Sequence, residues 1–270
     1  MTQLTFTKHH GLGNDFLVLV TPPVLDLAAL ARQVCNRRLG VGADGLLVLT
    51  DEAGYDARMV LYNADGSRAE MSGNGIRCFA QAIAMRRGHL GALRVLTDAG
   101  ERLVELFPGH EPGLLQAAVD MGPVQPLVEP EGWAALGCDP LRPVLHLSMG
   151  NPHSVVGVDE VAAVDLLALG SQVPHVNLEI IEPGPEPFAV TMRVHERGAG
   201  ITEACGTGAC ASAWAAQVWG LVPSGADEIV VHMDGGDATV RLHHPAPGHL
   251  TLVGPTQYVA TVVIDIGHSE

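Results

Sequence analysis

EMSGNG at residues 70–75 and EACGTG at residues 203–208 follow one pattern, at a constant offset of 133 positions. Each stretch leads into an alanine-rich segment, and alanine favours helix. A second pair of matching dipeptides, at an offset of 137, lies beside apolar runs: Gly13-Asn14 and Gly150-Asn151. A repeat at half the length of a 270-residue chain predicts two homologous domains that face each other across a pseudo-twofold cleft.

Short apolar runs with β-branched residues surround these stretches and are separated by Gly, Pro and Asp turn signals. The runs predict strands at residues 16–20, 46–50, 58–62, 93–97, 144–147, 188–194, 229–232 and 259–264. Three other segments predict helices, at residues 25–36, 75–87 and 207–219. Because strands and helices do not alternate regularly, the predicted fold class is α+β with a mostly antiparallel sheet.

The composition is typical of a folded globular chain, with 47% hydrophobic and 17% charged residues and a mean hydropathy of +0.23. No stretch reaches about 18 uninterrupted apolar residues, and the N-terminus lacks the basic and apolar regions of an export signal. The five cysteines form an odd set without a CxxC pair, which argues against a disulfide framework or a structural zinc site. We therefore expect a cytoplasmic protein with reduced thiols and no membrane partner.

The charge balance limits the possible ligands and cofactors. A formal charge of −15 without a basic patch argues against nucleic acid as a partner. The chain has 14 arginines but one lysine, Lys8. Pyridoxal phosphate enzymes need a Schiff-base lysine, and phosphate loops need a lysine after their glycines, so both classes are disfavoured.

The two repeated stretches predict two helix starts of similar chemistry. Glycines before each helix leave backbone N–H groups and the positive dipole end free to bind a carboxylate. Ser72 and Cys205 lie at these starts. We expect the helix start to lower the pKa of Cys205, so that its thiol becomes a usable base near neutral pH. An ordinary N-cap is an equally good interpretation of Ser72.

The remaining chemically interesting residues have plainer interpretations. Cys35, Cys78, Cys138 and Cys210 are expected to pack as small apolar residues. Asn14, Asn63 and Asn151 are turn formers by default. The pairs His9-His10 and His243-His244 lack HExxH spacing, so we expect surface histidines and no metal site.

Six motifs, in order along the chain, together resemble the diaminopimelate epimerases. They are HGLGNDF (10–16), GVGADGLL (40–47), NADGSRAEMSGNGIRCF (63–79), MGNPH (149–153), VNLE (176–179) and ERGAGITEACGTG (196–208). The resemblance implies two pseudo-symmetric domains, each an eight-stranded sheet rolled around a central helix. It also implies that the last strand, residues 257–266, returns to the first domain, which gives domains of 1–120 plus 257–270 and 121–256.

The same resemblance implies an isomerase of lysine and peptidoglycan synthesis, a small-molecule substrate and a homodimer. Such an enzyme interconverts LL- and meso-diaminopimelate without a cofactor or metal. Two thiols on opposite faces of the substrate α-carbon exchange its proton through a planar, carbanion-like intermediate. We expect the domains to close on the ligand, because exclusion of water makes a weak base effective.

The resemblance further implies the following roles for the residues at matching motif positions. Cys205 and Ser72 occupy the two catalytic positions, and His153 supports a catalytic thiol. Gly73, Asn74, Gly206 and Thr207 hold the reacting carboxylate and stabilise its charge. Glu196 pairs with the ammonium group. The rest of the substrate is recognised by Asn14, Asn63, Asn151, Asn177 and Arg197, the last of which suits bidentate pairing with the distal carboxylate.

Ser72 departs from the family motif, which reads Cys-Gly-Asn-Gly where this chain has Ser72-Gly73-Asn74-Gly75. A serine hydroxyl is far less acidic than a thiol and needs a base beside it. Cys205 alone would then abstract the proton, and epimerisation would be slow. The alternatives are a proline racemase-like relative with one-base chemistry, a cysteine hydrolase, and an amino-acid-binding protein without catalysis.

Overall fold

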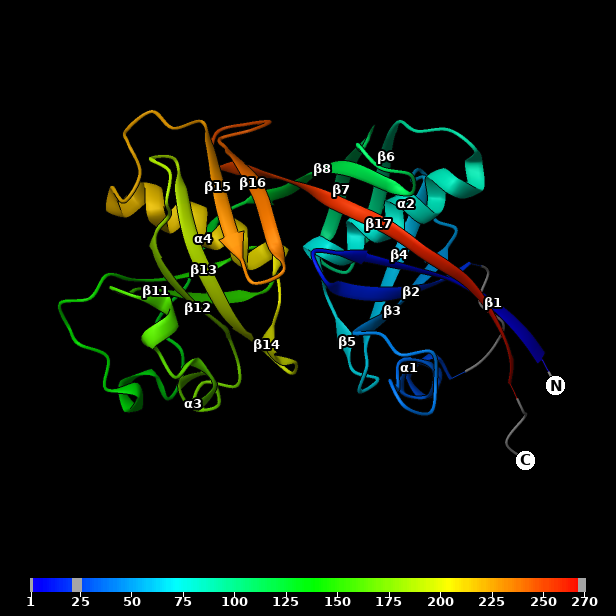
Figure 1. Ribbon diagram of the computed structural model, residues 1–270, viewed down its shortest axis with the longest axis horizontal. Coiled ribbons are helices and arrows are strands. Elements are labelled where there is room, and N and C mark those ends of the chain that lie inside the picture. Colours follow the sequence, from blue (N-terminus) through cyan, green and yellow to red (C-terminus); the bar gives the residue numbers. More distant parts are fainter. Residues whose placement is uncertain (1, 21–25, 267–270) are drawn as a thin grey trace. The chain divides into compact units, whose positions relative to one another are not determined.

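The computed structural model describes residues 2–20 and 26–266. The chain divides into two compact units, Met1–Ala117 with Pro255–Glu270, and Ala118–Gly254. These boundaries lie close to the positions 120/121 and 256/257 expected from the sequence. Two strands pass from one unit to the other: β8 (Leu114–Pro123) and β17 (His249–Ile266) (Figure 1).

The first unit is a mixed sheet with two helices. Its elements are β1 (Thr2–Gly11), β2 (Asn14–Val20), α1 (Leu27–Val34), β3 (Gly45–Thr50), β4 (Ala57–Asn63), β5 (Arg68–Ala69), α2 (Gly73–Arg87), β6 (Ala92–Thr97) and β7 (Gly100–Pro108). Neighbouring strands pair antiparallel except at β2–β3 and β4–β6, which are parallel. The unit is therefore α+β, with a mostly antiparallel sheet.

Helix α2 lies against the strands of its own sheet, chiefly β1 and β2 (Figure 1). Every residue from Gly73 to Ala84 is buried, as expected of a helix enclosed on all sides. Gly88 ends the helix in the left-handed conformation at φ 74°, where glycine has no side-chain penalty. The packing of α2 against β1 and β2 therefore fixes the position of its N-terminus within the unit.

The second unit repeats this plan. Its elements are β9 (Gln125–Pro126), a 3₁₀ turn (Trp133–Leu136), β10 (Val144–Ser148), β11 (Pro152–Gly157), a 3₁₀ turn (Val161–Ala163), α3 (Leu166–Gly170), β12 (Asn177–Pro183), β13 (Ala189–Glu196), β14 (Gly200–Thr202), α4 (Gly206–Trp219), β15 (Glu228–Met233) and β16 (Gly236–Leu242). The parallel pairs β11–β12 and β13–β15 stand where β2–β3 and β4–β6 stand in the first unit. Helix α4, like α2, is buried along most of its length.

The predicted strands and helices all correspond to observed elements. Helix α1 is shorter than predicted: Leu25 lies outside the described residues, and the helix ends before Asn36, whose side chain accepts hydrogen bonds from the backbone N–H groups of Arg38 and Leu39 at 2.9 Å each. The apolar patterns did not predict the strands β1, β5, β7, β8, β9, β11, β12, β14 and β16, the short helix α3 or the two 3₁₀ turns. Several missed strands contain histidines, prolines or charged residues that hide the apolar pattern.

The expectation that His9 lies on the surface is wrong. Its side chain is fully buried, and Nδ1 lies 3.0 Å from Oε1 of Gln81 on α2. Burial lowers the pKa of His9, which keeps the ring neutral. By contrast His243 and His244 are exposed, and His10 is half-buried.

The five cysteines are free. Cys35, Cys78 and Cys210 are buried, as predicted for packing residues, whereas Cys138 is only half-buried. Within residues 2–20 and 26–266, no helix is both long enough and apolar enough to span a membrane.

Candidate functional site

Ser72 is the N-cap of α2. Its backbone is extended, at φ −139° and ψ 122°, and its Oγ accepts a hydrogen bond from the N–H of Gly75 at 3.0 Å. The following residues, Gly73 and Asn74, form the first turn of the helix and are buried. The serine thus satisfies one of the free N–H groups of the helix start and leaves others for a ligand.

Cys205 caps α4 with nearly the same geometry. Its φ and ψ are −126° and 113°, and its Sγ accepts from the N–H of Gly208 at 3.3 Å. Gly206 and Thr207 open this helix and are buried. The sequence repeat therefore corresponds to a structural repeat in which a thiol replaces the hydroxyl.

The expectation that the helix start lowers the pKa of Cys205 is wrong. Burial raises the pKa of the thiol well above its ordinary value, and the nearby carboxyl groups of Glu196 and Glu179 raise it further. The hydroxyl of Thr207, 3.4 Å from Sγ, and the N–H of Gly208 act in the opposite direction without outweighing burial. The thiol is therefore protonated at neutral pH.

Glu196 lies at the end of β13, against Cys205. The Thr202 hydroxyl donates to its Oε1 at 2.6 Å, and its carboxyl group is near enough to Cys205 to raise the pKa of that thiol. Burial raises the pKa of Glu196 above the ordinary value. A carboxylate with a raised pKa is a stronger base than usual, so it suits the acceptance of a proton from the adjacent thiol.

Four further predicted residues of the second unit are linked by hydrogen bonds. The Asn151 amide donates to Thr207 Oγ1 at 3.3 Å, and its Oδ1 lies 2.9 Å from His153 Nε2. Asn177 donates to the carbonyl oxygen of Pro152 at 3.0 Å and accepts from the N–H of Arg197 at 2.9 Å. The structure therefore gathers these residues around the start of α4, with the side chain of Arg197 exposed.

In the first unit, the loop between β1 and β2 brings Asn14 to the start of α2. The amide of Asn74 donates to Asn14 Oδ1 at 3.1 Å, and Arg77 donates to Asn74 Oδ1 at 2.8 Å. The amide of Asn63 instead donates to Ser67 Oγ, at 3.0 Å, within the turn after β4. Asn14 and Asn74 are thus coupled to each other, while Asn63 is fixed by its own turn.

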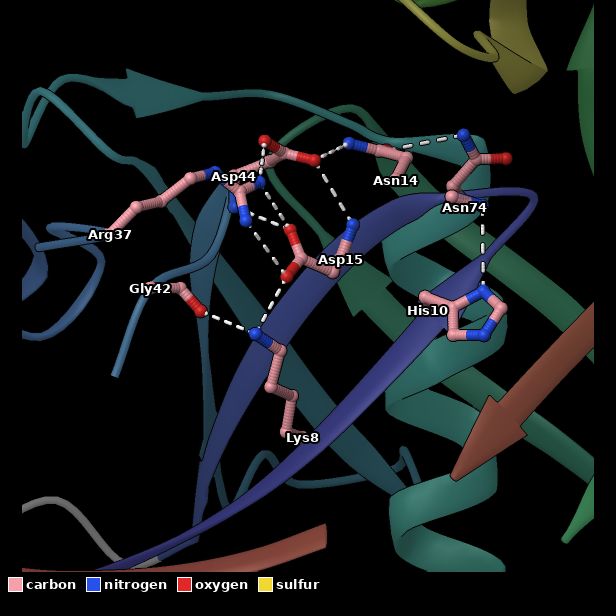
Figure 2. A network of polar contacts seen from close by, with 9 residues as sticks. Lys8, His10, Asn14, Asp15, Arg37, Gly42, Asp44 and Asn74 are labelled. Atoms are coloured by element: carbon pink, nitrogen blue, oxygen red, sulfur yellow. Dashed lines mark hydrogen bonds and ion pairs between the residues drawn. The ribbon is translucent and has the colours of Figure 1, made fainter. Parts of the chain in front are cut away.

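A network of charged groups fixes the side chain of Asn14 through its hydrogen bond to Asp44 (Figure 2). Asp44 accepts from the Asn14 amide at 2.8 Å and from Arg37 at 2.6 Å. Arg37 also contacts both oxygens of Asp15, at 2.7 and 3.3 Å, and Lys8 lies 2.8 Å from the same carboxylate. Lys8, the one lysine of the chain, therefore forms an ion pair with Asp15.

Replacement of Asp15 by asparagine is expected to lower the free energy of unfolding by about 2 kcal/mol at pH 7. Burial alone would raise the pKa of Asp15, but hydrogen bonds from Arg37 and Lys8 outweigh it and lower the pKa. The ionised form is therefore stabilised by folding, and its contribution disappears as the pH falls below about 4. Urea unfolding of the unmodified protein and of Asp15→Asn, at pH 7 and near pH 3, measures the difference in their free energies of unfolding. An undiminished difference at the lower pH would contradict the assignment to the ionised carboxylate.

Sequence reasoning missed Glu179 and Arg77 as part of these sites. Both side chains are fully buried. Glu179 Oε1 lies 2.6 Å from His153 Nδ1, and Arg77 donates to the carbonyl oxygens of Pro255 and Gly73, at 3.1 Å each. Both residues lie inside the motifs, in VNLE and GNGIRCF, and a charged residue in an otherwise apolar segment was the available signal. In the described part of the chain no cluster of metal-ligating side chains is present.

Known proteins are similar to this chain in sequence along nearly its whole length. The family model described as diaminopimelate epimerase matches residues 6–127 and 145–259. A diaminopimelate epimerase of Thermosynechococcus vestitus is 39% identical over 93% of this chain and 96% of its own length. Another, from Desulforapulum autotrophicum, is 36% identical over 98% and 100%.

Solved structures show the same fold at lower identity. A predicted epimerase of Pseudomonas aeruginosa superimposes with a TM-score of 0.77 at 15% identity and covers 98% of this chain and 100% of its own. A hydroxyproline epimerase of Agrobacterium vitis, with bound trans-4-hydroxy-L-proline, gives 0.70 at 14% identity, with 98% and 91% covered. From the family-model match and the relatives above 30% identity, the chain belongs to the diaminopimelate epimerase family.

Proposed function

We propose that the chain is an isomerase that converts LL-diaminopimelate to meso-diaminopimelate, without a cofactor, by exchange of the α-proton. The main support is the thiol of Cys205 at a buried helix start, where it contacts the Thr207 hydroxyl and the N–H of Gly208 and has the carboxyl group of Glu196 nearby. Because the α-proton of an amino acid is a very weak acid, its removal needs both a base and stabilisation of the charge that forms. Cys205 with Glu196 is the base, and the helix starts provide the stabilisation.

The reacting carboxylate is proposed to bind at the helix starts. Gly73 and Asn74 open α2, and Gly206 and Thr207 open α4. Their N–H groups donate to the carboxylate oxygens, and these hydrogen bonds strengthen as the carbanion delocalises its charge onto the carboxylate.

Proton removal is proposed to begin with a proton transfer from the Cys205 thiol to Glu196. The raised pKa values of both groups fit a thiol that stays protonated until the substrate is bound. The thiolate then takes the α-proton, and Ser72 stands at the position that returns a proton on the other face. The carboxyl group of Glu196 is also proposed to pair with the substrate ammonium group.

Recognition of the distal end of the substrate is proposed for the polar side chains around the two helix starts. These are Asn14, Asn63, Asn151, Asn177 and Arg197. Arg197 is exposed and can pair with a carboxylate in bidentate fashion. A proline-type substrate lacks a distal amino-acid group, so these residues favour diaminopimelate over the substrate of the hydroxyproline epimerase.

Proton NMR in deuterium oxide tests the proposed reaction. The α-hydrogen signals of LL- and meso-diaminopimelate are followed in separate samples while the other isomer is scored. Exchange with isomer conversion is the expected result, at a low rate. Exchange without conversion would assign one-base chemistry to Cys205, and binding without exchange would indicate an amino-acid-binding protein.

A further inference from the structure

We propose that Glu179 is a positioning residue for Cys205 and acts on it through a relay of hydrogen bonds inside the second unit. The relay runs through five side chains in this order: Glu179, His153, Asn151, Thr207 and Cys205. Successive polar atoms are 2.6, 2.9, 3.3 and 3.4 Å apart. The catalytic meaning of this relay rests on the function proposed for Cys205, but its hydrogen bonds can be tested without a substrate.

Glu179 is unusual because it is a fully buried carboxyl group with one side-chain partner. Oε1 lies 2.6 Å from His153 Nδ1, whereas Oε2 finds no hydrogen-bond partner among the described residues. Burial raises the pKa of Glu179, despite the opposing effect of His153. In a buried position, an ionised carboxylate with an oxygen that accepts no hydrogen bond is energetically unfavourable. The carboxyl and the imidazole therefore share a proton and form a pair without net charge.

The orientation of the Asn151 carboxamide determines whether Nε2 of His153 carries a proton. Its Nδ2 donates to Thr207, so its Oδ1 faces His153 Nε2. A carbonyl oxygen can only accept, and Nε2 must therefore be protonated. Glu179 stabilises this protonation state from the opposite side of the imidazole ring. The shared proton lies between Glu179 Oε1 and His153 Nδ1, so Nε2 retains its own proton.

The directions of the remaining bonds lead to the sulfur. Thr207 Oγ1 accepts a hydrogen from Asn151, and its own proton can point to Cys205 Sγ, 3.4 Å away. The N–H of Gly208 donates to the same sulfur at 3.3 Å. Both donors favour the thiolate and oppose the effect of burial. Glu179 thus orients one of the two donors that the thiolate needs when it forms.

The close approach of Glu179 to α4 depends on glycine at position 208. A Cβ at this position would lie 2.7 Å from Glu179 Oε1. The matching glycine of the first unit, Gly75, would meet the Cβ of Ser72, its own N-cap residue, at 3.0 Å. At the start of α4 the missing side chain therefore makes room for a carboxyl group that has reached the helix from β12.

Nitrogen NMR of the unmodified protein gives the first test, with ¹⁵N-labelled histidine and His153→Gln to assign the signals. We expect His153 Nε2 to be protonated at neutral pH and coupled to its hydrogen. An unprotonated Nε2 would overturn the proposal, because Asn151 could not then be oriented as the relay requires. This measurement needs no substrate and no folded variant of Glu179.

The second test compares Glu179→Leu with Glu179→Gln. Both changes remove the carboxyl group and have similar volume, but the glutamine amide can still donate to His153 Nδ1 and keep Nε2 protonated. The rate of Cys205 alkylation by iodoacetamide, read from its peptide by mass spectrometry at fixed pH, reports the thiolate fraction. We expect the leucine variant to react about tenfold more slowly than the glutamine variant. Equal rates in two folded variants would overturn the proposal.

Thr207→Val completes the test as a double-mutant cycle, with Thr207→Ser as the control that keeps the hydroxyl. If Glu179 acts through this hydroxyl, the valine variant is slow by itself, and added Glu179→Leu slows it no further. Additive losses would contradict the relay. Absence of α-proton exchange in the unmodified protein would instead contradict the proposed function, and alkylation rates would be unaffected by that outcome.

Discussion

Replacement of Ser72 by cysteine is expected to raise the turnover number for epimerisation by at least about 10²-fold. A cysteine thiol has an ordinary pKa near 8.5, whereas a serine hydroxyl is far less acidic and exchanges protons poorly. Positioned acid or base groups typically contribute about 10²- to 10⁴-fold to the rate. The proton NMR assay in deuterium oxide measures the change directly, as isomer conversion per unit time.

The helix start of α2 can accommodate the larger sulfur atom. Cys205 shows this at α4, where a thiol caps the helix with nearly the same φ and ψ and accepts from the N–H of Gly208 at 3.3 Å. Ser72 is only half-buried, which leaves more room than Cys205 has. The gain in rate therefore reflects proton transfer and not a repaired fold.

Ser72→Ala is the matched control for this prediction. It removes the hydroxyl and the N-cap bond to Gly75, so it should lower helix stability by about 1 kcal/mol. If Ser72 returns the proton with the help of a base, alanine abolishes the remaining conversion. Equal conversion rates for the serine, cysteine and alanine proteins would show that position 72 does not transfer a proton, and the two-base proposal would fail.

Replacement of Cys205 by serine is expected to lower both α-proton exchange and isomer conversion by at least about 10³-fold. Serine keeps a cap for the N–H of Gly208, so helix α4 should form normally. What is lost is the thiolate that Glu196, the Thr207 hydroxyl and the helix start are proposed to produce. Exchange of the α-proton is followed from each isomer separately, because a remaining one-sided activity would appear with one of them.

Cys210→Ala provides the control within the same helix. This thiol is fully buried in α4 but lies outside the proposed site. Its loss should cost stability and leave the exchange rate close to that of the unmodified protein at temperatures where both are folded. Unchanged exchange in Cys205→Ser would contradict the proposed role of Cys205, whatever the effect of the Cys210 change.

The positions of both helix starts could be predicted from the sequence because their signals are local. An N-cap needs a small polar side chain that accepts a hydrogen bond from the backbone N–H of the residue three positions later, and the repeat at offset 133 contained that pattern twice. Asn14 and Asn151 were likewise marked by preceding glycines, Gly13 and Gly150, at φ 83° and 93°. The geometry of a turn or a helix cap is determined by a few consecutive residues.

The sequence thus determined the repeat, the α+β class, the two capping residues and the resemblance to one family. Only the tertiary structure decided that His9 is buried, that Glu179 reaches His153, and that the pKa of Cys205 is raised and not lowered. These outcomes depend on burial and on charges that other strands bring close, such as β12 and the end of β13. A helix start favours a thiolate in any sequence, but desolvation and neighbouring carboxyl groups act through space and can reverse that preference.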